Sequence, residues 1–181
     1  MPVWLERVLI GVASLLLSVG LIAVLSGFFA GRDQAGVAGT AAGNIGQRFA
    51  DLGHAHLQPG EPRPAYNSSP PTSGAHMPAL LPPDGAQMTD DQLLQALEVG
   101  DVVILYGQQH PSRRLQAFAA SFGSYTPQLE AAGGAVVLAR KPGTRGLIAL
   151  AWTRSFRVSN ALDPLLKQFV TQWLGRGAPG R

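Results

Sequence analysis

The chain has 181 residues and a formal net charge of +3, with 46% hydrophobic and only 14% charged residues, so it has room for about one domain. It contains no cysteine, which excludes disulfide scaffolds, thiolate metal clusters and thiol catalysis. The sequence has no basic run with interleaved aromatic residues, so we expect no nucleic-acid partner.

The first part of the chain contains one long segment without charge, residues 8–30. As a helix it would be ~35 Å long, enough to cross the ~30 Å hydrocarbon core of a bilayer. Trp4, Phe28 and Phe29 flank it as interfacial aromatic residues do. The segment is longer than a signal-peptide core and ends in bulky residues, which favours an uncleaved anchor in contact with membrane lipid. We expect residues 1–7 to be a short cytoplasmic head.

A tether and a proline-rich arm follow the expected anchor. Residues 31–46 are rich in Gly and Ala and predict a flexible tether. The arm, residues 47–88, has eight prolines between positions 59 and 83, which exclude a long helix or a central strand there. A short helix is compatible with residues 45–52. The rest of the arm is either disordered or held extended by a folded partner.

Residues 89–175 show the periodicity of a compact α/β domain, and residues 176–181 form a tail. Thr89 and Gln92 form a capping box at the start of the first helix. The expected elements are a helix over 88–100, a strand over 102–106, a helix from Ser112 to Gly123, strands over 135–139 and 147–152, and a helix from Asp163 to Gly175.

This order predicts an α+β fold with a small mixed sheet and a β-α-β-β-α core. A right-handed crossover makes the first two strands parallel, and the third joins as an antiparallel hairpin strand. The order resembles the C-terminal part of thioredoxin-like folds, but the chain lacks the cysteines of their redox chemistry.

The segment from Tyr66 to His76 has the composition of a rigid loop that presents one imidazole. Two prolines stiffen the backbone, a Thr and a Ser can bond neighbouring main-chain groups, and a glycine permits a tight turn. The loop residues that we single out are Tyr66, Pro70, Pro71, Thr72, Ser73 and Gly74.

Three residues of this region and the next helix are candidate metal ligands: His56, His76 and Glu98. Nitrogen and oxygen ligands of this kind hold Zn²⁺ or Cu²⁺. In the alternative interpretation, His76 is a structural or solvated residue, and Glu98 is exposed or paired with an arginine. His54 and His110 are substitute ligands, although His110 precedes a proline in a turn and is expected to face solvent.

The string from Tyr66 to His76 resembles the Y-x-S-x-P-P-T-S-G-x-H signature of an uncharacterised bacterial family, a domain of unknown function. The resemblance implies one N-terminal membrane span, an extracytoplasmic domain and a His-rich set that looks like a metal site. His56, His76 and Glu98 match positions of that set. The family's helix-end motif H-x-L-E-H-G is degenerate, because this chain has Gln95-Ala96-Leu97-Glu98-Val99-Gly100.

Two functions are therefore compatible with the sequence. The first is a single-pass protein of the bacterial cell membrane whose extracytoplasmic domain is a non-catalytic accessory subunit of a membrane or envelope complex. The second is a Zn- or Cu-binding domain that uses His56, His76 and Glu98. We do not expect an enzyme, because Ser73 lies near His76 without the G-x-S-x-G pattern of a nucleophile elbow.

Overall fold

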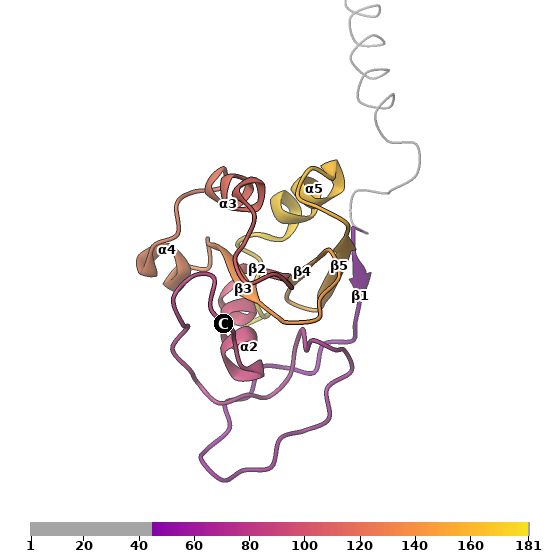
Figure 1. Ribbon diagram of the computed structural model, residues 1–181. Helices are drawn as coiled ribbons and strands as arrows, with labels where there is room; N and C mark the ends of the chain where they lie inside the picture. The colour runs from indigo at the N-terminus through magenta and orange to yellow at the C-terminus, as the bar shows by residue number, and fades with distance from the viewer. Residues whose placement is uncertain (1–44, 181) are drawn as a thin grey trace, which may run out of the picture. The chain divides into compact units, whose positions relative to one another are not determined.

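The computed structural model describes residues 45–180, which belong to one compact unit (Figure 1). The expected membrane segment, residues 8–30, and its flanking Trp4, Phe28 and Phe29 lie outside the described residues. Within residues 45–180, no helix has the length and apolar character needed to span a bilayer.

The described residues form a mixed α+β fold with a five-stranded sheet of order β1-β5-β4-β2-β3. β2 and β3 are parallel, as the crossover argument predicts, and the other three neighbouring pairs are antiparallel. The strands are β1 (Gln47–Arg48), β2 (Val102–Tyr106), β3 (Val136–Arg140), β4 (Leu147–Ala151) and β5 (Arg154–Val158); the helices are α2 (Asp90–Val99), α3 (Arg113–Ala120), α4 (Pro127–Ala131) and α5 (Pro164–Trp173).

The sheet separates two hydrophobic cores. Alternate residues of β2 face opposite sides: Val102 and Ile104 belong to the core shared with α3 and α5, whereas Val103 and Leu105 belong to the core under α2. Figure 1 shows α3 and α5 on one side of the sheet and α2 on the other. The apolar side of α2 packs against the sheet, and this packing fixes the position of the helix, including its last turn.

The predicted hairpin between the strands over 135–139 and 147–152 is wrong. β4 pairs with β2 rather than with β3, and it forms a hairpin with β5 instead. β2 and β4 are apolar at every position and fully buried, so both take central places in the sheet. β5 is buried only at its two ends and was not predicted, and neither was the short helix α4.

The predicted short helix over residues 45–52 is also wrong. Gln47 and Arg48 form β1, which pairs with Ser155 and Arg154 at the edge of the sheet. The unpaired backbone groups at the edge of β5 form hydrogen bonds with β1. A single helical turn offers fewer stabilising hydrogen bonds, because the first turn of a helix is costly to form.

The other edge of the sheet is covered by the end of the arm. The backbone N–H of Gly85 donates to the carbonyl oxygen of Leu138 (2.7 Å), and the Leu138 N–H donates to the carboxylate of Asp84 (2.7 Å). The arm therefore shields the exposed side of β3, the strand that would otherwise offer unpaired backbone groups to other chains.

The middle of the arm packs against the hairpin turn between β4 and β5. Pro70 to Gly74 are buried, and the Thr153 N–H donates to the Thr72 carbonyl oxygen (2.8 Å). The side-chain oxygen of Ser73 accepts from the Leu52 N–H (3.1 Å). The folded body thus holds the arm extended. This is one of the two alternatives that the prolines of the arm left open, and the other was disorder.

The first turn of α2 holds the arm through a carboxylate. Thr89 and Gln92 form the predicted capping box, and Asp91 follows it. The Asp91 carboxylate accepts from the Arg63 guanidinium (2.7 Å) and from the Met77 N–H (3.1 Å). Burial alone would raise the pKa of Asp91, but these hydrogen bonds favour the charged form and hold its pKa below the ordinary value.

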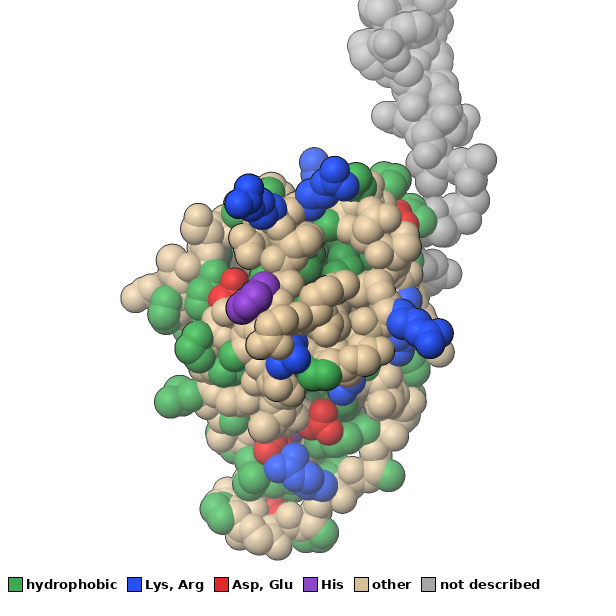
Figure 2. All heavy atoms as spheres, viewed as in Figure 1, with side chains coloured by type: hydrophobic (Ala, Val, Ile, Leu, Met, Phe, Trp, Pro, Cys, Tyr) green, Lys and Arg blue, Asp and Glu red, His purple; other side chains and the backbone are tan. Residues whose placement is uncertain are grey.

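Basic side chains do not gather in one place on the face seen in Figure 2, where Lys and Arg lie in separate positions over the body. One Arg–carboxylate ion pair joins Arg63 of the arm to Asp91 of α2.

We predict that Asp91→Asn destabilises the protein in a pH-dependent way. Because the folded pKa is lowered, Asp91 contributes stability above about pH 4, and this contribution is lost as the pH falls through the folded pKa. At pH 7 the substitution should lower the free energy of unfolding by about 1–2 kcal/mol, the value of a hydrogen bond to a charged group. Urea unfolding at pH 7, 5 and 3 measures the difference.

The exposed neighbour Asp90 provides the control, since Asp90→Asn leaves the Arg63 and Met77 contacts in place. The difference in the free energy of unfolding between Asp91→Asn and the unsubstituted protein should become smaller toward pH 3. A gap that stays constant from pH 7 to pH 3 would show that the charge of Asp91 is not what stabilises the arm.

Candidate metal centre

Two segments of the arm run side by side and bring two histidines together. His56 and His76 form a parallel β-bridge, in which the Leu57 N–H donates to the His76 carbonyl oxygen (2.9 Å) and the His76 N–H donates to that of Ala55 (3.1 Å). The two imidazole rings meet edge to face, with 5.3 Å between their centroids. Main-chain hydrogen bonds therefore set the spacing of the two side chains.

Glu98 comes to this place from the last turn of α2. The helix ends at Gly100 in the left-handed conformation, and its last turn has no basic residue. Glu98 is buried, with 4% of its surface exposed. The negative end of the helix dipole disfavours a carboxylate here, so a buried Glu98 requires positive charge or strong donors nearby.

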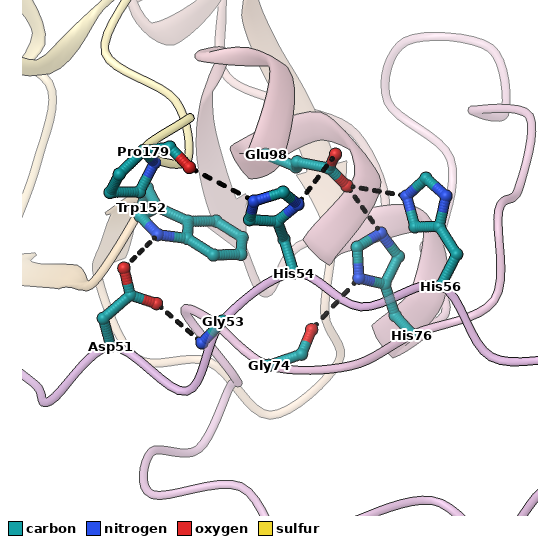
Figure 3. A network of polar contacts seen from close by, with 9 residues as sticks. All are labelled: Asp51, Gly53, His54, His56, Gly74, His76, Glu98, Trp152 and Pro179. Atoms are coloured by element: carbon teal, nitrogen blue, oxygen red, sulfur yellow. Dashed lines mark hydrogen bonds and ion pairs between the residues drawn. The ribbon is translucent and has the colours of Figure 1, made fainter. Parts of the chain in front are cut away.

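The three predicted ligands converge (Figure 3). Nε2 of His56 lies 3.1 Å from Oε2 of Glu98, and Nε2 of His76 lies 3.2 Å from the same oxygen. One ligand atom from each residue lies within 4.8 Å of the other two. The arrangement forms a His-His-Glu set that can hold a metal ion.

The second nitrogen of His76 shows which atom faces the centre. Nδ1 lies 3.1 Å from the carbonyl oxygen of Gly74, which can only accept, so Nδ1 carries the proton. In the neutral ring, Nε2 then presents a lone pair toward Glu98. This nitrogen is fully buried and has no partner with hydrogen-bond geometry among the described residues, although an oxygen lies 3.2 Å away. Two acceptors thus face each other in the interior.

A third imidazole approaches the other oxygen of Glu98. Nδ1 of His54 lies 3.6 Å from Oε1, and Nε2 of His54 lies 3.2 Å from the carbonyl oxygen of Pro179. The ring also meets Trp152 edge to face, with 6.4 Å between centroids. Trp152 is fixed in turn, because its indole N–H donates to Asp51 (3.1 Å).

The access to the centre differs from one ligand to the next. The side chain of His76 is 0% exposed, whereas those of His56 and His54 are 45% and 35% exposed. The centre is therefore closed to solvent at His76 and open to solvent at His54 and His56, where an ion can enter.

The loop residues singled out from the sequence support the centre without touching Glu98. Tyr66 donates its hydroxyl to the Ala75 carbonyl oxygen (3.0 Å), and its ring lies over Gly74. Gly74 has φ +130, and a Cβ there would lie 2.9 Å from the Tyr66 ring, so no other residue fits. The buried residues Pro70, Pro71, Thr72 and Ser73 complete the loop.

Sequence reasoning missed the contribution of the C-terminal tail. The Ala178 N–H donates to the Glu98 carbonyl oxygen (2.9 Å), and Pro179 contacts His54. A tail of Gly, Ala and Pro carries no signal for such a position. His110 is exposed, as its turn predicts.

The degenerate helix-end positions face a different environment. Gln95 and Val99 line a surface hollow of about 380 Å³ together with Pro78 to Leu81 of the arm and residues of α4. Leu80 at this hollow is 92% exposed. The hollow places hydrophobic side chains beside the metal centre at the surface.

Comparison with known proteins adds a family but no characterised relative. No curated protein and no solved structure matches the chain. A family model described as "Protein of unknown function (DUF3105)" matches residues 56–180, which include His56, His76 and Glu98. The match covers more than half of the chain, and the protein therefore belongs to this family of unknown function.

Proposed function

We propose that this protein is a metal-binding domain that holds Zn²⁺ or Cu²⁺ through Nε2 of His56, Nε2 of His76 and Oε2 of Glu98. The observation that carries the proposal is the buried Nε2 of His76, which faces a carboxylate oxygen at 3.2 Å without a hydrogen bond. A cation between the two acceptors removes their repulsion, and neither acceptor has to move far to bind it.

The surroundings of Glu98 support the same function. The partners that lie within ion-pair distance of Glu98 among the described residues are three histidines. Nε2 of His56 donates a hydrogen bond to Oε2 of Glu98 (3.1 Å), but no lysine or arginine of the described residues offsets this buried carboxylate at the negative end of a helix. A divalent ion bound by the carboxylate and two neutral imidazoles supplies the missing positive charge.

The donor set suits a borderline transition-metal ion. Two imidazole nitrogens and one carboxylate oxygen are ligands that Zn²⁺ and Cu²⁺ accept, and Ca²⁺ and Mg²⁺ prefer oxygen alone. The hydrogen bond from Nδ1 of His76 to the Gly74 carbonyl is the outer contact that orients metal-bound histidines. The thioredoxin-like strand order suggests no further chemistry, because the chain has no cysteine.

The cellular setting of this proposal rests on the sequence. The uncharged segment over residues 8–30 supports a single-pass anchor in the bacterial cell membrane, with the metal-binding domain outside the cytoplasm. In this position the domain meets metal ions of the cell envelope.

Metal titration tests the proposal directly. Purified full-length protein in neutral detergent, stripped with a chelator, should bind one equivalent of Zn²⁺ by calorimetry and elemental analysis. Zinc at 100 times its Kd should add about 2.7 kcal/mol to the free energy of unfolding. His76→Ala should weaken binding by more than about 100-fold, since even outer contacts of a metal site are worth 10–100-fold.

Two further variants make the result decisive. His56→Ala removes a half-exposed ligand and should weaken binding without disturbing the fold, which His76→Ala could do because His76 is buried. His110→Ala removes an exposed histidine far from the cluster in sequence and should bind zinc as the unsubstituted protein does. Equal zinc binding by all three variants would refute the proposal.

The accessory-subunit function is a second candidate, favoured by the hollow beside α2. Gln95, Val99 and the exposed Leu80 offer an apolar surface at the place where the degenerate motif lies. Leu80 lies at this hollow together with Pro78, Ala79 and Leu81, and apolar side chains gathered in one place are typical of an interaction surface. We propose a hydrophobic segment of a membrane or envelope protein as its occupant.

Site-specific photocrosslinking tests this second function in cells. A photoreactive phenylalanine analogue in place of Leu80 should give one discrete crosslinked partner. The same residue at Leu162, which is 67% exposed, provides the matched control. Identical products at both positions, or no product at Leu80, would contradict a docking role for the hollow.

A further inference from the structure

His54 holds the same type of position as His76, although it lies before the residues that the family model matches, 56–180. One ring nitrogen of each histidine contacts a backbone carbonyl oxygen: Nε2 of His54 meets Pro179 (3.2 Å), and Nδ1 of His76 meets Gly74 (3.1 Å). The other nitrogen of each faces Glu98.

The carbonyl contact fixes the role of the remaining nitrogen. A carbonyl oxygen accepts only, so Nε2 of His54 is the protonated nitrogen of the neutral ring. Nδ1 then directs a lone pair toward Oε1 of Glu98, 3.6 Å away. Metal-bound histidines have this arrangement, with one nitrogen on the ion and the other donating to a carbonyl.

The C-terminal tail that supplies the carbonyl is itself attached to the end of α2. The Ala178 N–H donates to the Glu98 carbonyl oxygen (2.9 Å), and the Gly175 N–H donates to that of Gly100 (2.8 Å). A Cβ on Gly177 would lie 2.0 Å from the Glu98 carbonyl oxygen, so only glycine permits this close approach. Figure 1 shows the C-terminus beside α2.

We propose that His54 is the fourth protein ligand of the metal ion, bound through Nδ1, and that the Pro179 carbonyl positions it. This inference rests on the proposed function, because it adds a ligand to the His56, His76 and Glu98 set. Nδ1 of His54 lies beside Oε1, while the other two imidazoles face Oε2. His54 is not in the group whose ligand atoms lie within 4.8 Å of one another, so its ring has to move toward Oε2 to bind the same ion. Four protein ligands make a closed site of the structural or storage type rather than an open catalytic one.

Cobalt spectroscopy of the full-length protein in neutral detergent tests the ligand count. Co²⁺ takes the place of the spectroscopically silent Zn²⁺. Its visible absorption is strong in four-coordinate tetrahedral sites and weaker where water raises the coordination number to five or six, and the band positions depend on the ligands. The unsubstituted protein should give the strong spectrum. His54→Ala should lose most of this intensity and bind Co²⁺ at least about 10-fold more weakly, whereas His110→Ala should leave both unchanged.

The outcomes separate this inference from the function on which it rests. No Co²⁺ binding by the unsubstituted protein would refute the metal site as a whole. Binding with the same spectrum in His54→Ala would refute the fourth ligand and leave the three-ligand site intact. Weaker binding with unchanged band positions and intensity would likewise refute ligation, because exchange of an imidazole for water shifts the cobalt bands, and it would assign His54 an orienting role only.

A chain that ends at Gly177 tests the part assigned to the tail. It lacks Pro179 and the Ala178 N–H but keeps all four ligands. Its cobalt spectrum should lose intensity as that of His54→Ala does, while circular dichroism shows an unchanged fold. A folded, truncated chain with the full spectrum would refute the positioning role of the Pro179 carbonyl.

Discussion

The buried carboxylate of Glu98 is the constraint around which the described part of the molecule is arranged. It lies in the last turn of α2, where the helix dipole is unfavourable and where no lysine or arginine of residues 45–180 forms an ion pair with it. Three imidazoles from the arm surround it instead, and the tail binds the carbonyl of the same residue. Such an arrangement is costly for a bare carboxylate and favourable for one that shares a cation with its neighbours.

Main-chain hydrogen bonds, rather than side-chain packing, give the centre its geometry. The bridge between His56 and His76 fixes two rings, and backbone carbonyls of Gly74 and Pro179 orient His76 and His54. The proline-rich loop adds stiffness, and Asp91 ties the backbone next to His76 to the first turn of α2. The ligands are therefore largely positioned before any ion binds, which reduces the ordering that binding requires.

Local signals in the sequence predict much of this structure. The capping box at Thr89 placed α2, the apolar run at Val102 placed β2, and the loop string pointed to His76. The neighbours of β4, the edge strand β1 and the position of the tail could not be read, because each depends on contacts between residues far apart in the chain. β5 was readable in principle, since Arg154-Ser155-Phe156-Arg157-Val158 has a weak alternation that marks a strand near a sheet edge.

The proposed fourth ligand, His54, bears on the helix-end positions at which the resemblance implies histidines. Gln95 and Val99 stand where the resembling family has histidines, and here they line an apolar hollow with Leu80. Glu98, on the same helix end, faces the arm histidines. If His54 replaces the ligands lost from α2, coordination has moved from the helix to the arm and the adjoining helix surface is free to become apolar.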